Sequence, residues 1–155
     1  MSKGPSYDIV WGNAITLSML ADGGVALDLN QVPEGPGVYI FLRQHSSKCD
    51  ALYVGQSLTL RNRIRLQLNN LKLMKEIRNS RTGTRLLVVG RFVPKQGQQL
   101  KPSLKKIESA FIRHFVAHND ALLNKQGTSI KLATVQSDRK ILKNFLPKTV
   151  SVETK

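Results

Sequence analysis

Two prolines and two glycines fall within residues 32–37, and this concentration excludes a regular element there. The next segment, residues 38–42, is a run of β-branched and aromatic side chains that predicts a strand. A polar stretch over residues 44–50 predicts a loop, and residues 51–54 predict a second strand that Gly55 ends. Two short strands joined by a modest loop most simply form an antiparallel hairpin. The sequence therefore predicts a sheet at this point of the chain.

The residues after this hairpin have helical spacing. Ser57 or Thr59 is a suitable N-cap for a helix. An apolar stripe at helical spacing follows, made of Leu60, Ile64, Leu68 and Leu71. Residues 72–85 are basic, and we expect them to be partly helical at most.

A third strand and a second long helix complete the predicted core. Residues 85–93 predict a strand that Pro94 ends. Residues 104–118 show helical spacing, and a short helix is expected near residues 137–145. The predicted class is therefore α+β, a small three-stranded antiparallel sheet flanked by helices.

The length of 155 residues fits one domain. We expect an N-terminal extension over residues 1–31 packed on the domain, a central domain over residues 32–128, and a basic C-terminal helix or tail over residues 129–155. A net charge of +14 exceeds the magnitude of about 2–8 that solubility needs in a small domain. This excess favours a polyanionic partner, nucleic acid before an anionic membrane surface.

Two classes of protein are excluded by what the sequence lacks. The single cysteine, Cys49, excludes an intrachain disulfide and a cysteine-rich zinc site. No apolar run reaches the ~18–20 residues of a membrane span. We therefore expect a cytoplasmic protein with no membrane partner.

One acidic residue interrupts the apolar face of the second long helix. With Leu104 set to zero on a helical wheel, Phe111 falls near roughly 340°, Phe115 near roughly 20° and Glu108 near roughly 40°. A carboxylate in such a stripe is paired, bound to a metal or neutral. A buried salt bridge to an arginine is one interpretation of Glu108, and a metal ligand or an acid/base group at the edge of a cleft is the other.

The first long helix carries a similar pair. With Leu60 at zero, Arg63 lies near roughly 300° and Gln67 near roughly 340°, both bordering the apolar stripe. Arg63 can extend outward to solvent, or it can point into the same cleft as Glu108. A carboxylate and a guanidinium in one cleft suit phosphoryl chemistry, since the first holds a divalent cation and the second neutralises phosphate charge.

Two of the three tyrosines stand in the predicted hairpin. Tyr39 follows Gly37 by two residues, and Tyr53 precedes Gly55 by two. A strand tyrosine on its own most often packs in a core with a hydrated hydroxyl. Two of them near an arginine and an acid also suit a catalytic site.

These residues resemble the GIY-YIG nuclease family. The two signature triplets occur as residues 37–39 and 53–55, each with valine in place of isoleucine. The helical arginine of the family matches Arg63, its metal-binding glutamate matches Glu108, and its downstream asparagine matches Asn124. The resemblance covers roughly residues 29–127 and is close to the nuclease module of bacterial excision-repair nucleases.

The resemblance implies the GIY-YIG fold and Mg²⁺-dependent hydrolysis of DNA phosphodiester bonds, with Mn²⁺ as a substitute. Glu108 would hold the metal, Arg63 would stabilise charge on the attacked phosphate, and Tyr39 or Tyr53 would orient or deprotonate the attacking water. Asn124 would link the glutamate's loop and the substrate through its amide.

One position departs from the family. Gln67 stands where the family often has a tyrosine or histidine. A glutamine hydrogen-bonds a phosphate or water but does not transfer a proton at neutral pH. The predicted catalytic set is Tyr39, Tyr53, Arg63, Gln67, Glu108 and Asn124.

The excess positive charge predicts contacts to the DNA backbone. The predicted nucleic-acid-binding residues are Gln56, Arg61, Arg65, Lys72, Lys75, Arg78, Arg81 and Arg85. The alternative for this set is a solvated basic face. The predicted partner is double-stranded or branched DNA. The sequence is compatible with a homodimer and with binding of a partner subunit. The predicted role is a restriction, defence or repair endonuclease; the alternatives are a catalytically inactive nucleic-acid-binding module of the same fold and a basic structural protein of ribosomal type.

Overall fold

The computed structural model describes residues 6–80, 82–118, 120, 122–124, 132–138, 145–147 and 149–153. The strands are β1 (Ser6–Trp11), β2 (Ile15–Thr16), β3 (Ser18–Met19), β4 (Val25–Ala26), β5 (Gly37–His45), β6 (Lys48–Ser57), β7 (Thr84–Val93), β8 (Leu132–Asp138) and β9 (Thr149–Glu153). The helices are a 3-10 turn η1 (Leu29–Gln31) and the α-helices α1 (Leu60–Leu68), α2 (Leu71–Arg78) and α3 (Leu100–Ala117).

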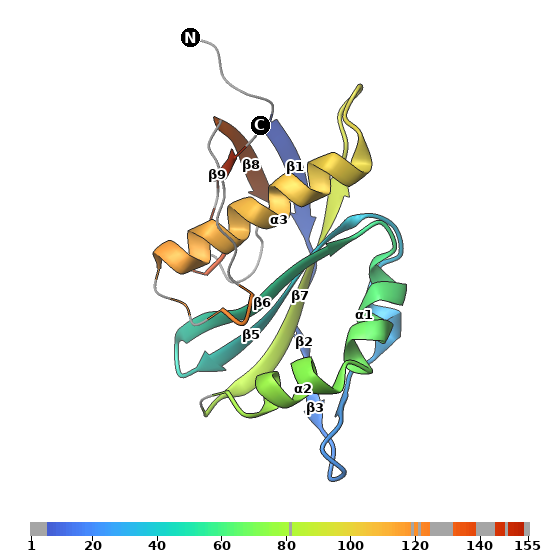
Figure 1. Ribbon diagram of the computed structural model, residues 1–155, viewed down its shortest axis with the longest axis vertical. Helices are drawn as coiled ribbons and strands as arrows, with labels where there is room; N and C mark the ends of the chain where they lie inside the picture. The colour runs from blue at the N-terminus through green and yellow to red at the C-terminus, as the bar shows by residue number, and fades with distance from the viewer. Residues whose placement is uncertain are drawn as a thin grey trace.

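A long twisted sheet forms the centre of the molecule (Figure 1). Six of its strands lie in the order β6-β5-β7-β1-β8-β9, and the short strand β2 also pairs with β7. The strands β3 and β4 form a separate hairpin. The α+β class is confirmed, and β6, β5 and β7 are the three antiparallel strands that the sequence predicts. The sheet has more than the three predicted strands. Both β1 and β2 pair with β7 in antiparallel fashion, and β1 also pairs with β8 in parallel.

The N-terminal strand follows from its own residue pattern. Tyr7, Ile9 and Trp11 are buried, and they alternate with Ser6, Asp8 and Val10, which are partly exposed. Alternation at period two is typical of a strand with one face on a core. Part of the N-terminal 31 residues is thus built into the sheet.

The β5–β6 hairpin is longer than predicted. The strands reach His45 and Lys48, so most of the polar stretch 44–50 lies in strands and not in a loop. The turn needs a left-handed backbone at Ser46, whose φ is 56°. Arg43 and Asp50 face each other across the two strands as a hydrogen-bonded ion pair, which explains why polar residues pair here.

The first predicted helix is in fact two. The α1 helix ends at Leu68, and Asn70 caps α2 by accepting the Leu73 N–H at 3.2 Å. The predicted stripe is therefore wrong at Leu71, which is 80% exposed. Residues 137 and 138 of the predicted C-terminal helix lie in β8 instead, and residues 139–144 lie outside the described residues.

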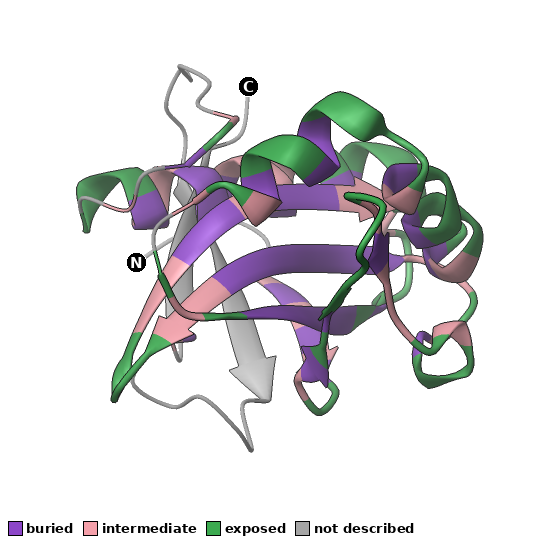
Figure 2. Cartoon of the chain, turned by 90° about the horizontal axis from the view of Figure 1, so that it is seen from below, coloured by how far each residue is buried: buried purple, intermediate pink, exposed green. Residues whose placement is uncertain are grey.

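The helices divide between the two faces of the sheet, and the central strands are buried on both sides (Figure 2). The α3 helix packs through Leu104, Ile107 and Phe111 on one face. The α1 and α2 helices cover the other face, which carries Tyr39 and Phe41 of β5. Within the described chain, no helix combines the length and the apolar character that crossing a membrane requires.

The outer edge of β6 is bordered by the segment after α3. The Asp120 carboxylate accepts the Ala51 N–H at 2.7 Å, and the Leu123 N–H donates to the Leu52 carbonyl at 2.7 Å. The segment thereby follows β6 toward the second half of that strand.

Candidate active site

Tyr39 and Tyr53 lie on neighbouring strands with their rings stacked. The ring centroids are 6.3 Å apart and the planes differ by 22°. Tyr39 pairs with Gly55 across the β5–β6 ladder, and a Cβ at Gly55 would collide with the Tyr39 ring. The glycine is therefore needed so that the ring can lie across β6. Tyr39 is 1% exposed, whereas Tyr53 is only partly buried.

Gln67 joins the two tyrosine hydroxyls. Its Nε2 donates to the Tyr39 hydroxyl at 2.9 Å and to the Tyr53 hydroxyl at 3.4 Å. The Gln67 side chain is buried because it belongs to the face of α1 that also buries Leu60 and Ile64. The Gln67 side chain thus places an amide donor between the two tyrosine hydroxyls.

Arg63 lies one helical turn before Gln67 on α1. Hydrogen bonding toward the Tyr39 oxygen is the main cause that raises the pKa of Arg63, and the charges of Tyr39, Tyr53 and Glu108 act in the same direction. Burial raises the pKa of Tyr39, while the hydrogen bonds from Gln67 and Arg63 oppose this rise. The two donors stabilise a negative charge on the Tyr39 oxygen.

Glu108 brings the acidic group of the site. Burial raises its pKa to about 7, and the positive charges of Lys105 and Arg63 act in the opposite direction. The carboxylate lies on α3, on the face of the sheet opposite α1. Since β6 is the outermost strand, side chains from the two faces can approach each other beside it. The positive charge of Arg63 acts on Glu108 over this distance, but no ion pair or hydrogen bond among the described residues joins the two side chains.

Asn124 lies against the strand that carries the second tyrosine. Its Nδ2 donates to the Val54 carbonyl at 2.6 Å, and its Oδ1 accepts the Val54 N–H at 3.2 Å. Both ends of the amide are thus occupied by the backbone of β6. Asn124 fixes the edge of the strand next to Tyr53, which differs from the predicted link between the glutamate's loop and a substrate.

The residues predicted to contact DNA fall into two groups. Lys72 and Lys75 are exposed on α2, and Arg65 is exposed on α1, where its Nη2 donates to the Asn62 Oδ1 at 2.6 Å. Gln56 is partly buried in β6. Lys72, Lys75 and Arg65 are accessible to a ligand on the α1–α2 side, whereas Gln56 pairs with Val38 and belongs to the face of the sheet that α3 covers.

Three arginines of the set have structural partners instead. Arg85 is 9% exposed, and its guanidinium donates to the carbonyls of Ile77, Arg78, Ser80 and Gly83. Arg85 therefore closes the C-terminal end of α2, and the prediction that it contacts DNA is corrected. Arg61 donates to the Val32 carbonyl at 2.8 Å and Arg78 to the Leu20 carbonyl at 2.8 Å. Arg81 lies outside the described residues.

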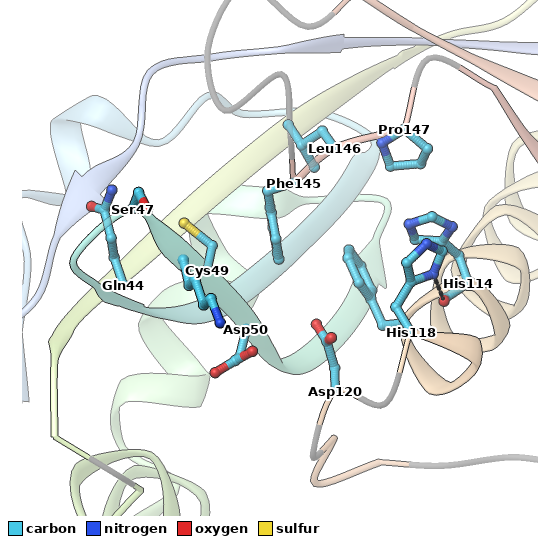
Figure 3. A pocket seen from close by; sticks show the side chains of 12 residues that line it. Gln44, Ser47, Cys49, Asp50, His114, His118, Asp120, Phe145, Leu146 and Pro147 are labelled. Carbon is cyan, nitrogen blue, oxygen red and sulfur yellow. Dashed lines mark hydrogen bonds between the residues drawn. The ribbon is translucent and has the colours of Figure 1, made fainter.

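A cavity of about 810 Å³ opens elsewhere, between the β5–β6 turn, the end of α3 and residues 145–147 (Figure 3). His114, His118 and Asp120 face it from the α3 side. Burial lowers the pKa of His114 to about 4, with the charge of His118 acting in the same direction. Sequence reasoning missed this cavity because three segments distant along the chain form it. Within the described part of the chain, no three His, Cys, Asp or Glu side chains group closely enough to hold a metal ion.

Comparisons with protein-family models, with curated proteins and with solved structures found no match to this chain.

Proposed function

We propose that this chain is a divalent-metal-dependent endonuclease of GIY-YIG type that hydrolyses DNA phosphodiester bonds. The observation that carries the proposal is the grouping of Tyr39, Tyr53, Gln67 and Arg63, with Glu108 near enough for its charge to act on Arg63. Gln67 and Arg63 bind the Tyr39 hydroxyl, and Arg63 is electrostatically coupled to Tyr53 and Glu108. A guanidinium beside a carboxylate and two phenols suits the charge that develops on a phosphate during hydrolysis.

The donor chemistry at Glu108 fits Mg²⁺. This ion commonly binds proteins through one or two carboxylates and completes its shell with water and substrate phosphate oxygens. Glu108 is partly buried and its pKa is raised to about 7, so a bound Mg²⁺ would compete with the proton for this carboxylate at neutral pH. When bound, the metal would supply Lewis-acid stabilisation of the phosphate. Glu108 is the residue that would hold it.

The other residues have separate tasks in this proposal. Arg63 is exposed at the surface of α1 and binds a non-bridging phosphate oxygen while it retains its link to Tyr39. Tyr53 is the more accessible phenol and contacts the attacking water. Tyr39, buried and held by two N–H donors, keeps Arg63 and Gln67 in place.

The surface around this group suits a DNA backbone. Lys72 and Lys75 are exposed on α2, close in sequence to Gln67, and the chain carries a net charge of +14. Lysine contacts to phosphate release counterions, so binding weakens steeply as salt increases. The accessible cations therefore support a DNA substrate.

A catalytically inactive DNA-binding module is the second candidate. The observation in its favour is Gln67 itself, because an amide cannot transfer a proton where the family has an ionisable group. Such a module would retain the exposed lysines and bind DNA in a salt-dependent way without cutting it.

Plasmid cleavage distinguishes the two functions. Purified chain is incubated with supercoiled plasmid and Mg²⁺ or Mn²⁺, and Glu108→Gln is compared with Glu76→Gln. Glu76 is exposed on α2, so its substitution is a matched control for loss of one carboxylate. Nicking by the wild type and by Glu76→Gln, but not by Glu108→Gln, supports the nuclease. Salt-dependent binding without cutting in either metal supports the inactive module.

The biological role is tested by mapping cleavage sites on a random DNA library. One sharp sequence motif indicates a restriction enzyme, and cleavage at flaps or lesions indicates repair. Diffuse cleavage indicates a defence nuclease.

A further inference from the structure

A chain of hydrogen bonds links the start of α2 to both tyrosines of the proposed active site. The Asn70 Oδ1 accepts the Leu73 N–H at 3.2 Å, and the Asn70 Nδ2 donates to the Gln67 Oε1 at 3.4 Å. Gln67 Nε2 then donates to the hydroxyls of Tyr39 and Tyr53. Asn70 is exposed, so this chain begins at the surface and ends in the core.

The first member of the chain sets the orientation of every other member. A backbone N–H can only donate, so Leu73 requires an acceptor, and the Asn70 Oδ1 is that acceptor. The Asn70 Nδ2 consequently faces Gln67, where it requires an acceptor in turn. The Gln67 Oε1 therefore faces Asn70, and the Gln67 Nε2 faces the tyrosines.

The orientation of Gln67 decides what the two phenol oxygens do. With Nε2 toward them, both hydroxyl oxygens accept from Gln67 and direct their own hydrogens elsewhere. With Oε1 toward them, the hydroxyls would donate to Gln67 and would present lone pairs to other groups. The two arrangements differ in which phenol can accept a proton or orient a water.

We infer that Asn70 is a positioning residue, which acts through Gln67 to keep both tyrosine hydroxyls as hydrogen-bond acceptors for the phosphodiester cleavage. This inference rests on the proposed function. Asn70 does not touch the reacting atoms in this proposal. Its effect is transmitted by the amide of Gln67.

The substitution Asn70→Asp tests the inference without disturbing the cap. A carboxylate is as good an N-cap as an asparagine amide, and it suits the positive end of the helix dipole. It offers only acceptors, so it can still bind the Leu73 N–H but can no longer donate to the Gln67 Oε1. The Gln67 amide is then expected to rotate and turn its oxygen toward the tyrosines.

Asn69→Asp is the matched control. Asn69 is also exposed, and its replacement by aspartate introduces the same negative charge one residue away from position 70. The Asn69 Nδ2 donates to the Arg65 carbonyl at 3.3 Å, and no side-chain hydrogen bond joins Asn69 to Gln67 among the described contacts. Gln67→Met removes the donor itself at similar side-chain length and serves as the second variant.

The first measurement needs neither metal nor DNA. The chain has three tyrosines, so ¹³Cζ labelling of tyrosine gives three NMR signals. Asn70→Asp should shift the signals of Tyr39 and Tyr53 and leave that of Tyr7 unchanged, at an unchanged or higher melting temperature. The control Asn69→Asp should leave all three signals in place. Signals that shift in Gln67→Met but not in Asn70→Asp would overturn the inference, and so would unchanged signals in both variants.

The second measurement is cleavage at saturating DNA with Mg²⁺. Asn70→Asp should reduce the cleavage rate roughly tenfold relative to Asn69→Asp, as expected for the loss of hydrogen bonds in the site. DNA affinity should match that of the control. If the wild type cuts and Asn70→Asp cuts equally fast, the positioning role alone fails. If the wild type cuts no DNA, the nuclease proposal fails together with this inference.

Discussion

Replacing Gly55 by alanine is expected to disturb the proposed active site through a single methyl group. The new Cβ would lie 2.7 Å from the Tyr39 Cε2 and closer still to its Cζ and hydroxyl oxygen. The Tyr39 ring cannot easily move away, because the residue is only 1% exposed and its hydroxyl is hydrogen-bonded by Gln67. The ring also packs edge-on against Phe41, with the two ring centroids 5.9 Å apart. Inserting atoms into a core packed like this costs about 1–3 kcal/mol.

The assay for Gly55→Ala is thermal unfolding followed by circular dichroism. A chain of this size changes its melting temperature by about 2–4 °C per kcal/mol, so a decrease of about 2–12 °C is expected. DNA cleavage should fall as well, because Tyr39 is displaced from Arg63. Gly12→Ala is the matched control, since a Cβ at Gly12 would meet its nearest atom, the Val89 carbonyl oxygen, at an ordinary 3.7 Å. Equal melting temperatures for the two variants would refute the argument that Tyr39 occupies the space above Gly55.

Three further results are expected. The pKa of Glu108 is raised to about 7 in the folded chain, so the folded state holds an extra proton between the pKa of the unfolded chain and pH 7, and stability falls as pH rises through this window. Glu108→Gln should therefore have a higher melting temperature than the wild type at pH 8, and this difference should shrink toward pH 4. No difference at pH 8 would mean that the Glu108 carboxylate is solvated. Arg85→Met should lower the free energy of unfolding by about 1–3 kcal/mol, because the buried carbonyls at the end of α2 lose their hydrogen-bond donor. Urea denaturation measures this free energy. An unchanged value would mean that water replaces the guanidinium. Lys75→Ala should reduce the slope of log binding constant against log salt by about one, measured by fluorescence anisotropy with labelled DNA, and an unchanged slope would remove Lys75 from the interface.

The sequence predicts the central strands well because their signals are local. The β-branched and aromatic run at the start of β5, the strand before Gly55 and the strand before Pro94 all occur close to where they are expected. The sheet was expected to be smaller because β1 joins it through pairing with β7, a partner distant along the chain. The sequence of neither segment alone indicates which distant strand it pairs with.

The candidate site shows the same limit. Glu108 is identifiable from the sequence because a carboxylate interrupts an apolar helical face, and the structure leaves it partly buried as that pattern indicates. Arg85 looks like an exposed cation at the start of a strand, and only the folded chain brings the C-terminal carbonyls of α2 to its guanidinium. Asn70 looks like a turn residue, and its link to Gln67 depends on where α1 stops.

The residues that follow α3 have a consequence for self-association. The outermost strand of a sheet normally offers free N–H and C=O groups that a second chain can pair with. Here Asp120, Leu123 and Asn124 occupy such groups on Ala51, Leu52 and Val54. A dimer of this chain would therefore have to form through another surface, because continuing the sheet across β6 would first require this short segment to be displaced.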